Sequence, residues 1–102
     1  MPKVSYLAKL RAKEGKGDEL VAAFEPIFEQ VGREPGTLLY VMSRAKGDPD
    51  VFWFSEMYAD DDALAAHGSS DAIAKAAPGF DGLIADADMI LGEPVFGKGL
   101  PG

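Results

Sequence analysis

Residues 51–58 read Val-Phe-Trp-Phe-Ser-Glu-Met-Tyr, and the predicted fold depends most on this stretch. Its aromatic residues favour a β-strand, and apolar side chains fall on both of its faces. A strand of that kind is normally covered on both sides. In a chain of 102 residues, helices can cover one face, and a second copy of the chain is the natural cover for the other.

The segments on either side of this strand read as further strands. Residues 37–44 are rich in β-forming residues, and a turn at residues 46–50 joins them to residues 51–58, which predicts a hairpin. Residues 3–11 alternate between polar and apolar, as in a half-buried strand. The apolar face of that first strand carries Val4, Tyr6, Ala8 and Leu10.

The longest predicted helix covers residues 18–33. Asp18 is its expected N-cap, and Pro26 is expected to kink it near residues 22–26 because proline removes a backbone hydrogen bond. One apolar stripe with helical spacing marks the buried side. The stripe consists of Leu20, Val21, Phe24, Ile27, Phe28 and Val31.

Two short helices are predicted after the third strand. The acidic residues 60–62 begin the first helix, which runs to His67 and is closed by Gly68. Ser70 caps the second helix, expected over residues 71–77 and ended by Pro78 and Gly79.

The element order predicts a ferredoxin-like α+β fold, β-α-β-β-α-β, with four antiparallel strands and the helices on one face. The last strand is expected over residues 85–96, interrupted or ended at residues 92–94. Residues 1–102 form a single domain, and the tail at residues 97–102 is expected to be flexible. The bare, apolar face of the sheet predicts a homodimer, since a chain this short has a thin core.

Composition excludes several classes of partner and site. The formal charge of −7 argues against nucleic acid and against anionic membranes. No apolar stretch approaches the roughly 20 residues that span a bilayer, and no secretory signal begins the chain, so a cytoplasmic location is expected. The absence of cysteine excludes disulfides and thiolate metal sites, and the single histidine, His67, excludes a site built from several imidazoles of one subunit.

Two segments resemble the antibiotic biosynthesis monooxygenase family. The first is Glu34-Pro35-Gly36 followed by Tyr40, and the second runs from Phe52 through Glu56 and Tyr58 to His67. The resemblance implies that the domain pairs into a homodimeric α+β barrel. It also implies oxygenation of a small electron-rich aromatic, such as a phenol, anthrone or quinol, with no metal or organic cofactor.

The resemblance leaves other functions open, because one fold hosts many functions. The main alternative is a non-catalytic dimeric barrel that binds a small apolar ligand, and an isomerase or a haem-degrading enzyme ranks below it. The haem-degrading relatives and the best-studied anthrone oxygenase use an asparagine in the pocket, and this chain contains none. The haem interpretation keeps only Trp53 and His67 as candidate residues.

His67 is the candidate catalytic residue. Histidine is the side chain whose ordinary pKa, about 6.5, lies near cellular pH, so it could take a proton from a hydroxyaromatic substrate. The resulting anion is electron-rich enough to react with dioxygen. The alternative is that His67 caps the C-terminus of its helix, where a cation is favourable and Gly68 follows.

Five further residues are candidates for substrate binding. Glu56 either lies at a pocket or is satisfied by a nearby donor such as Arg44 or Lys9, and the structural role is favoured. Trp53 and Phe54 point to opposite faces, and Trp53 is the better pocket candidate because its indole N–H can hold a substrate oxygen. Tyr6, Tyr40 and Tyr58 could donate hydrogen bonds to a quinone-like oxygen, although tyrosines at sheet ends more often pack at interfaces.

The Glu34-Pro35-Gly36 segment is interpreted as a turn without a chemical role. Gly36 is expected to adopt a positive φ, which glycine allows at no steric cost.

Overall fold

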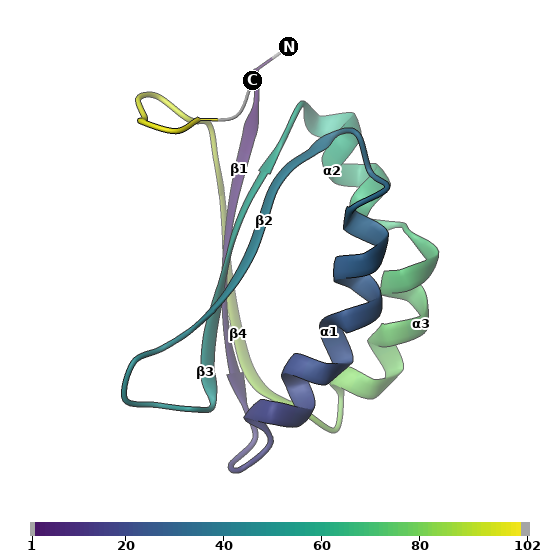
Figure 1. Ribbon diagram of the computed structural model, residues 1–102, viewed down its shortest axis with the longest axis vertical. Coiled ribbons are helices and arrows are strands. Elements are labelled where there is room, and N and C mark those ends of the chain that lie inside the picture. Colours follow the sequence, from purple (N-terminus) through teal and green to yellow (C-terminus); the bar gives the residue numbers. More distant parts are fainter. Residues whose placement is uncertain (1, 101–102) are drawn as a thin grey trace.

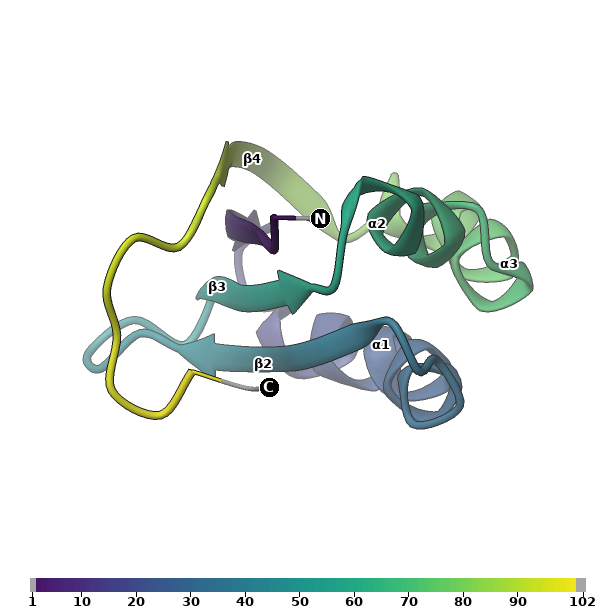
Figure 2. The same ribbon diagram turned by 90° about the horizontal axis from the view of Figure 1, so that it is seen from above.

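The computed structural model describes residues 2–100 and confirms the ferredoxin-like α+β fold. All strand pairs are antiparallel, in the order β2-β3-β1-β4. Figures 1 and 2 show that the helices lie on one side of the sheet. The elements are β1 (Val4–Ala12), α1 (Gly17–Val31), β2 (Thr37–Arg44), β3 (Val51–Tyr58), α2 (Asp61–Gly68), α3 (Asp71–Phe80) and β4 (Ile84–Gly92).

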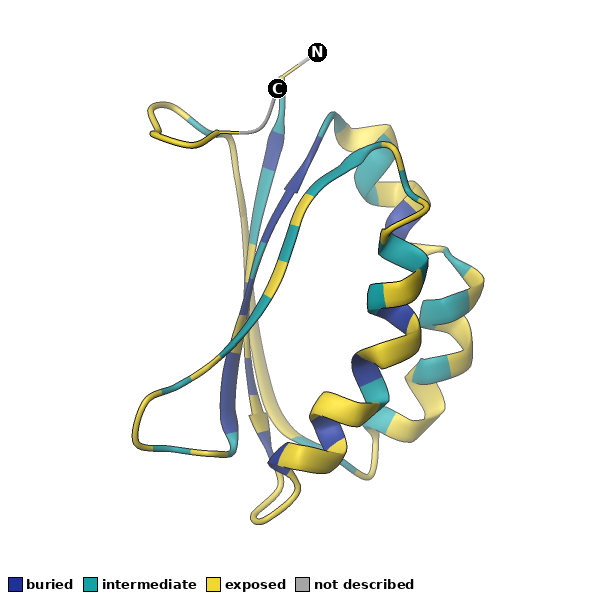
Figure 3. Ribbon diagram, in the orientation of Figure 1, coloured by how far each residue is buried: buried dark blue, intermediate teal, exposed yellow. Residues whose placement is uncertain are grey.

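The core lies between the sheet and the helices, where the dark blue residues of Figure 3 meet. The predicted inner face of β1 is confirmed, and the register pairs Ala8 with Phe54, so both side chains leave the sheet on the helix side. Phe24 of α1 packs against Phe54 with 4.7 Å between ring centroids. The main cluster of buried residues is Ala8, Leu10, Ala12, Leu20, Phe24, Ile27, Phe52 and Phe54.

The second short helix extends further than predicted. It was expected to end at Ala77, but α3 continues through Pro78 to Phe80. The reason is tertiary packing, since the ring of Phe80 stacks on Phe24 with 4.8 Å between centroids. That contact holds the last turn of the helix over the core despite the backbone hydrogen bond that proline removes.

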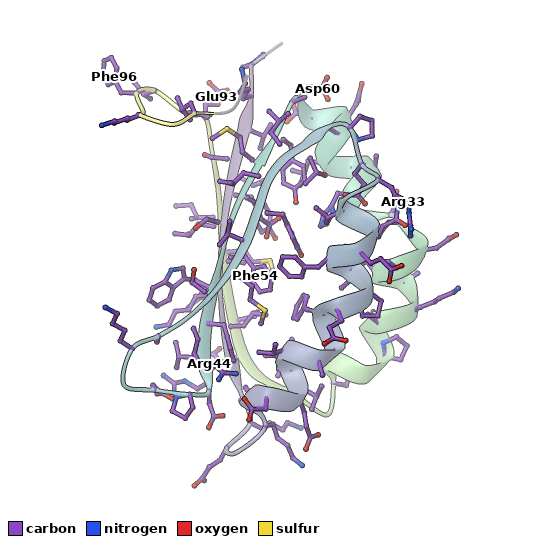
Figure 4. All side chains as sticks on the ribbon, viewed as in Figure 1. Arg33, Arg44, Phe54, Asp60, Glu93 and Phe96 are labelled. Carbon is purple, nitrogen blue, oxygen red and sulfur yellow. The ribbon has the colours of Figure 1, made fainter. Side chains whose placement is uncertain are left out.

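The last strand ends at Gly92, which is the shorter of the two expected extents. The residues after it project from the domain, and Val95 and Phe96 are 79% and 94% exposed. Figure 4 shows Phe96 pointing away from the body of the molecule. The predicted flexibility of the tail stays a prediction, and its residues Pro101 and Gly102 lie outside the described part.

The long helix has its N-cap at Lys16, two residues before the expected cap Asp18, and it ends at Val31 rather than near Arg33. Asp50, at the start of β3, accepts hydrogen bonds from the backbone N–H groups of Gly15 at 3.0 Å and Gly17 at 2.9 Å. A carboxylate from a distant segment therefore satisfies the free donors at the start of α1. The side chain of Asp18 instead accepts a hydrogen bond from Arg44 at 2.9 Å.

Replacing Gly17 with alanine is expected to destabilise the domain by about 3 kcal/mol. An added Cβ would lie 2.2 Å from the carbonyl oxygen of Pro49 and 2.8 Å from Oδ1 of Asp50, so the turn would have to move. Thermal unfolding measures the change. Gly79→Ala in α3 is the matched control, because its Cβ would meet no atom within 4 Å. The expectation is wrong if both variants unfold at the same temperature.

The face of the sheet opposite the helices carries a row of exposed residues. The strand registers place Ile90, Leu7, Ser55 and Val41 side by side across β4, β1, β3 and β2. Ile90 is 65% exposed, Leu7 49% and Val41 42%. We call this side the bare face. Among the described residues, the helices are too short or too polar to cross a membrane.

Candidate functional site

The helix side of the sheet carries a row of polar residues at its centre. The strand registers align Tyr6 of β1, Glu56 of β3 and Tyr40 of β2, so their side chains stand next to one another on one face. A cavity of about 280 Å³ opens above this row. Its walls are formed by Tyr6, Ala8, Leu10, Phe24, Tyr40, Phe54, Glu56, Leu64, His67, Gly68, Ile73 and Met89.

His67 projects from the last turn of α2 into the wall of this cavity and is only 6% exposed. Its Nδ1 lies 2.8 Å from Oε1 of Glu34, and its ring packs against Tyr40 and Tyr58 with centroid distances of 4.9 and 5.4 Å. Among the described residues, the end of α2 is capped by the backbone N–H of Ser69, which bonds the carbonyls of Ala65 and His67. The imidazole therefore faces a carboxylate and the cavity.

Glu34 fixes which nitrogen of His67 carries the proton. An ionised carboxylate only accepts hydrogen bonds, so Nδ1 must be the donor, and the lone pair of the neutral ring stays on Nε2. Burial raises the pKa of Glu34, but the hydrogen bonds from His67 and from Thr37, at 2.8 Å, lower that pKa below its ordinary value. The carboxylate is therefore held in its charged form.

Sequence reasoning missed Glu34, because its partner lies 33 residues away in the chain. An acidic residue in the turn between a helix and a strand is expected at the surface, and only the three-dimensional structure shows its partner. The available signal was its place in the first of the two segments that resemble the family.

Gly36 packs closely against α2, and this contact places Glu34 beside that helix. The predicted positive φ is wrong, since among the described residues only Gly15, Gly47 and Gly99 adopt one. A Cβ on Gly36 would lie 2.5 Å from the Cβ of Ala63, so glycine is needed here for the approach of the turn to α2. The carbonyl of Gly36 also accepts a hydrogen bond from the N–H of Ala59 at 2.9 Å.

Glu56 is the carboxyl group that lines the cavity itself, and it is 8% exposed. The hydroxyl of Tyr58 donates a hydrogen bond to its Oε1. The expected partners were wrong: Lys9 belongs to the bare face, and Arg44 pairs with Asp18. Burial raises the pKa of Glu56 and outweighs the lowering by the Tyr58 hydrogen bond and the charge of His67.

Three tyrosines lie around Glu56, and their phenol groups are held in the neutral form. Burial, followed by the charge of Glu56, raises the pKa of Tyr6, and the same two causes raise that of Tyr40. Burial and the hydrogen bond with Glu56 raise the pKa of Tyr58, which is fully buried. The hydroxyl of Tyr6 donates to the sulfur of Met89 at 2.7 Å, at the β4 side of the cavity.

Trp53 lies away from this site. Strand alternation sends Phe54 into the core, as Figure 4 shows, and Trp53 to the bare face, where it is 40% exposed. The cavity therefore brings together His67, Glu56, Tyr6 and Tyr40, with Tyr58 directly behind, and does not include Trp53.

The arrangement offers one oriented base, one buried acid and several phenol donors beside an apolar space. Such a site can take a proton from a bound hydroxyl group and hold the oxygens of a flat ring. Among residues 2–100, no group of three or more histidine, cysteine, aspartate or glutamate side chains is placed to hold a metal ion.

A family model described as antibiotic biosynthesis monooxygenase matches residues 4–79. The fold is similar to that of a candidate antibiotic biosynthesis monooxygenase from Caulobacter crescentus, with 27% identity, 93% and 92% of the two chains covered and a TM-score of 0.86. A candidate of the same kind from Chloroflexus aurantiacus has 28% identity, 95% and 97% coverage and a TM-score of 0.80.

A protein from Pseudomonas aeruginosa shares the fold with a TM-score of 0.87, 19% identity and 94% and 97% coverage. No curated protein matches the chain.

Proposed function

The chain belongs to the antibiotic biosynthesis monooxygenase family, and from that membership we propose that it oxygenates a small, flat, electron-rich aromatic such as a quinol or anthrone. The proposed reaction uses no metal or organic cofactor. The observation that carries the proposal is the His67–Glu34 pair, 2.8 Å apart, at the wall of an apolar cavity.

In the proposed first step, Nε2 of His67 takes a proton from a hydroxyl group of the substrate. The imidazolium that forms keeps its Nδ1–H on Glu34, whose negative charge stabilises it. The substrate becomes an anion inside a largely apolar space, where its negative charge is poorly solvated. An electron-rich anion of this kind is the species that can transfer electrons to dioxygen.

The electrons for the reaction come from the substrate itself. For an anthrone-like substrate, a CH₂ group becomes C=O, one oxygen atom of dioxygen enters the product, and the other leaves as water. Because this balance is complete, the proposed reaction needs no external reductant. A neutral phenol group is suited to binding the product, since the hydroxyl of Tyr40 at the cavity wall can donate a hydrogen bond to a carbonyl oxygen.

The cavity limits the size of the substrate. Its volume of about 280 Å³ is at the lower end of the range for small-molecule sites, roughly 300–1,000 Å³. Rings of Phe24 and Phe54 and the side chain of Ile73 give it an apolar lining that suits a flat aromatic. We expect substrates of two or three fused rings with a hydroxyl group directed at His67.

We also propose that the domain forms a homodimer through the bare face. This face exposes Ile90, Leu7 and Val41 in one row and Trp53 beside them, so a large apolar surface is left in water. A hollow of about 410 Å³ lies on the same side, between Leu39, Met57 and Ile90. A second copy would bury this surface and complete an α+β barrel.

Dioxygen uptake with a panel of hydroquinones and anthrones tests the proposed activity. We expect uptake that depends on both enzyme and substrate, and incorporation of one labelled oxygen atom when ¹⁸O₂ is used, as measured by mass spectrometry of the product. Tight binding of the same compounds without any uptake would contradict the proposal and favour a barrel that only binds small apolar ligands.

The activity is expected to survive treatment with EDTA followed by dialysis. One histidine and no cysteine offer no strong set of ligands for a transition metal. Dioxygen uptake before and after chelation gives the comparison, and metal analysis of the dialysed protein is the control. Activity that disappears and returns only with an added metal ion would contradict this part of the proposal.

A further inference from the structure

Glu34, behind His67, and Glu56, at the cavity wall, are two carboxyl groups in opposite environments, and proton removal from a hydroxyl group needs only one of them. Glu34 is bonded by His67 and Thr37, so it serves the base. Glu56 lines the cavity with His67, and its one side-chain partner among the described residues is the hydroxyl of Tyr58. Glu56 is therefore a buried carboxyl group with a single neutral donor. The first step of the proposed oxygenation does not use it.

The hydrogen bond to Glu56 leaves one of its oxygens free for a proton. Tyr58 donates to Oε1, so a neutral carboxyl group would carry its proton on Oε2. Burial favours that neutral form, because it raises the pKa of Glu56. After giving up this proton, the carboxylate would still be stabilised by the Tyr58 hydroxyl.

We propose that this cavity also enolises a cyclic aromatic ketone without dioxygen, with Glu56 as the acid and His67 as the base. His67 removes a proton from the carbon next to the carbonyl group, and the C–H electron pair forms a C=C bond. The C=O π pair takes the proton of Glu56, which gives an enol. No oxidation occurs, and the reverse step returns both protons.

The charges formed in this step are each held by a group already in place. The imidazolium of His67 lies against Glu34, and the carboxylate of Glu56 accepts from Tyr58. The cavity wall thus offers an acid from β3 and a base from α2 to one bound molecule. A ketone of two fused rings suits the volume of about 280 Å³.

The groups that face Glu56 predict how the rate depends on pH. They are Tyr6 from β1, Tyr40 from β2, Tyr58 from β3 and His67 from α2, and no lysine or arginine is among the described residues of the cavity wall. The step needs a neutral imidazole and a protonated carboxyl group. The rate should therefore fall at high pH as Glu56 ionises, and the raised pKa of Glu56 moves that fall to higher pH than for an exposed carboxyl group.

The test is hydrogen–deuterium exchange of 2-tetralone in D₂O under nitrogen, followed by proton NMR at the carbon next to the carbonyl. We expect wild-type protein to accelerate exchange over buffer, and Glu56→Gln to lower the enzymatic rate by about 10²–10⁴. Glu14→Gln is the matched control, because Glu14 is exposed and is not among the residues that line the cavity. It should exchange at the wild-type rate.

A second variant separates proton donation from a structural role of Glu56. Tyr58→Phe removes the hydrogen bond that stabilises the carboxylate, so Glu56 should ionise at a higher pH. The falling limb of the pH profile should then move to higher pH, which a packing role would not cause.

Exchange at the wild-type rate in Glu56→Gln, or no exchange and no binding of 2-tetralone by the wild type, would overturn the proposal. Because dioxygen is absent, a failure of oxygenase activity is seen separately in the uptake experiment.

Discussion

Replacing His67 with alanine is expected to lower kcat of the proposed oxygenation by about 10²–10⁴, the usual contribution of a positioned base. The substitution removes the nitrogen that takes the proton of the substrate. It also removes one of the two hydrogen-bond donors of the buried Glu34 carboxylate and leaves only Thr37, which should cost about 1–3 kcal/mol of stability. Steady-state dioxygen uptake and thermal unfolding on the same variant measure the two effects.

A second substitution at this position separates chemistry from stability. In His67→Asn, the amide nitrogen can stand in for Nδ1 and bond Glu34, but the side chain cannot act as a base. We expect the loss of rate to persist and much of the stability to return. Glu34→Gln keeps an acceptor for Nδ1 but removes the charge that stabilises imidazolium, and it should lower the rate by about 10–10².

The proposed role requires the lone pair on Nε2 of His67, so the neutral imidazole is the active form. A fully active and stable His67→Ala protein would contradict the proposed role of His67. The domain would then be better described as a binding protein.

Replacing Val41 with glutamate is expected to convert the proposed dimer into a monomer. Val41 lies in the exposed row with Leu7 and Ile90, so a dimer through the bare face would bring two new carboxylates into a buried apolar interface. Such a placement costs several kcal/mol, or about 10³-fold or more in affinity. Sedimentation at micromolar concentration should give roughly twice the chain mass of 10.8 kDa for the wild type and that single mass for the variant.

The matched control is Val21→Glu on α1, since Val21 is 38% exposed and Val41 is 42% exposed. Because Val21 lies on the helix layer, this variant should remain dimeric. Dissociation of both variants, or a wild type that sediments as a clean monomer, would contradict an interface on the bare face.

The strands could be predicted from local pattern, because alternation and the order of the elements along the chain are visible in consecutive residues. The alternation of residues 3–11 placed Tyr6, Ala8 and Leu10 on one face, and the caps Asp60 and Ser70 were found at the starts of α2 and α3. What sequence could not give was any contact between distant segments. Asp50 starts α1 from another part of the chain, and Phe80 holds α3 together beyond Pro78.

The site was predicted in part for the same reason. His67 stands out as the single histidine, and the tyrosines were found through their place in strands and in the family-like segments. The partner of His67 was missed because no local rule links Glu34 to a helix 33 residues away. The face of the sheet on which Trp53 lies could not be predicted. Alternation shows which residues share a face, but it does not show which face the helices cover.

The cavity and the bare face lie on the two surfaces of one four-stranded sheet, and alternate residues of the same strands form them. In β1, Tyr6 and Ala8 belong to the first surface and Leu7 and Lys9 to the second. Insertion or deletion of one residue within this strand would therefore exchange the two sets and damage chemistry and assembly together. Point substitutions act on one surface at a time. A mutant library confined to every second position of β1 could thus change either the chemistry of the cavity or the assembly through the bare face, and leave the other unchanged.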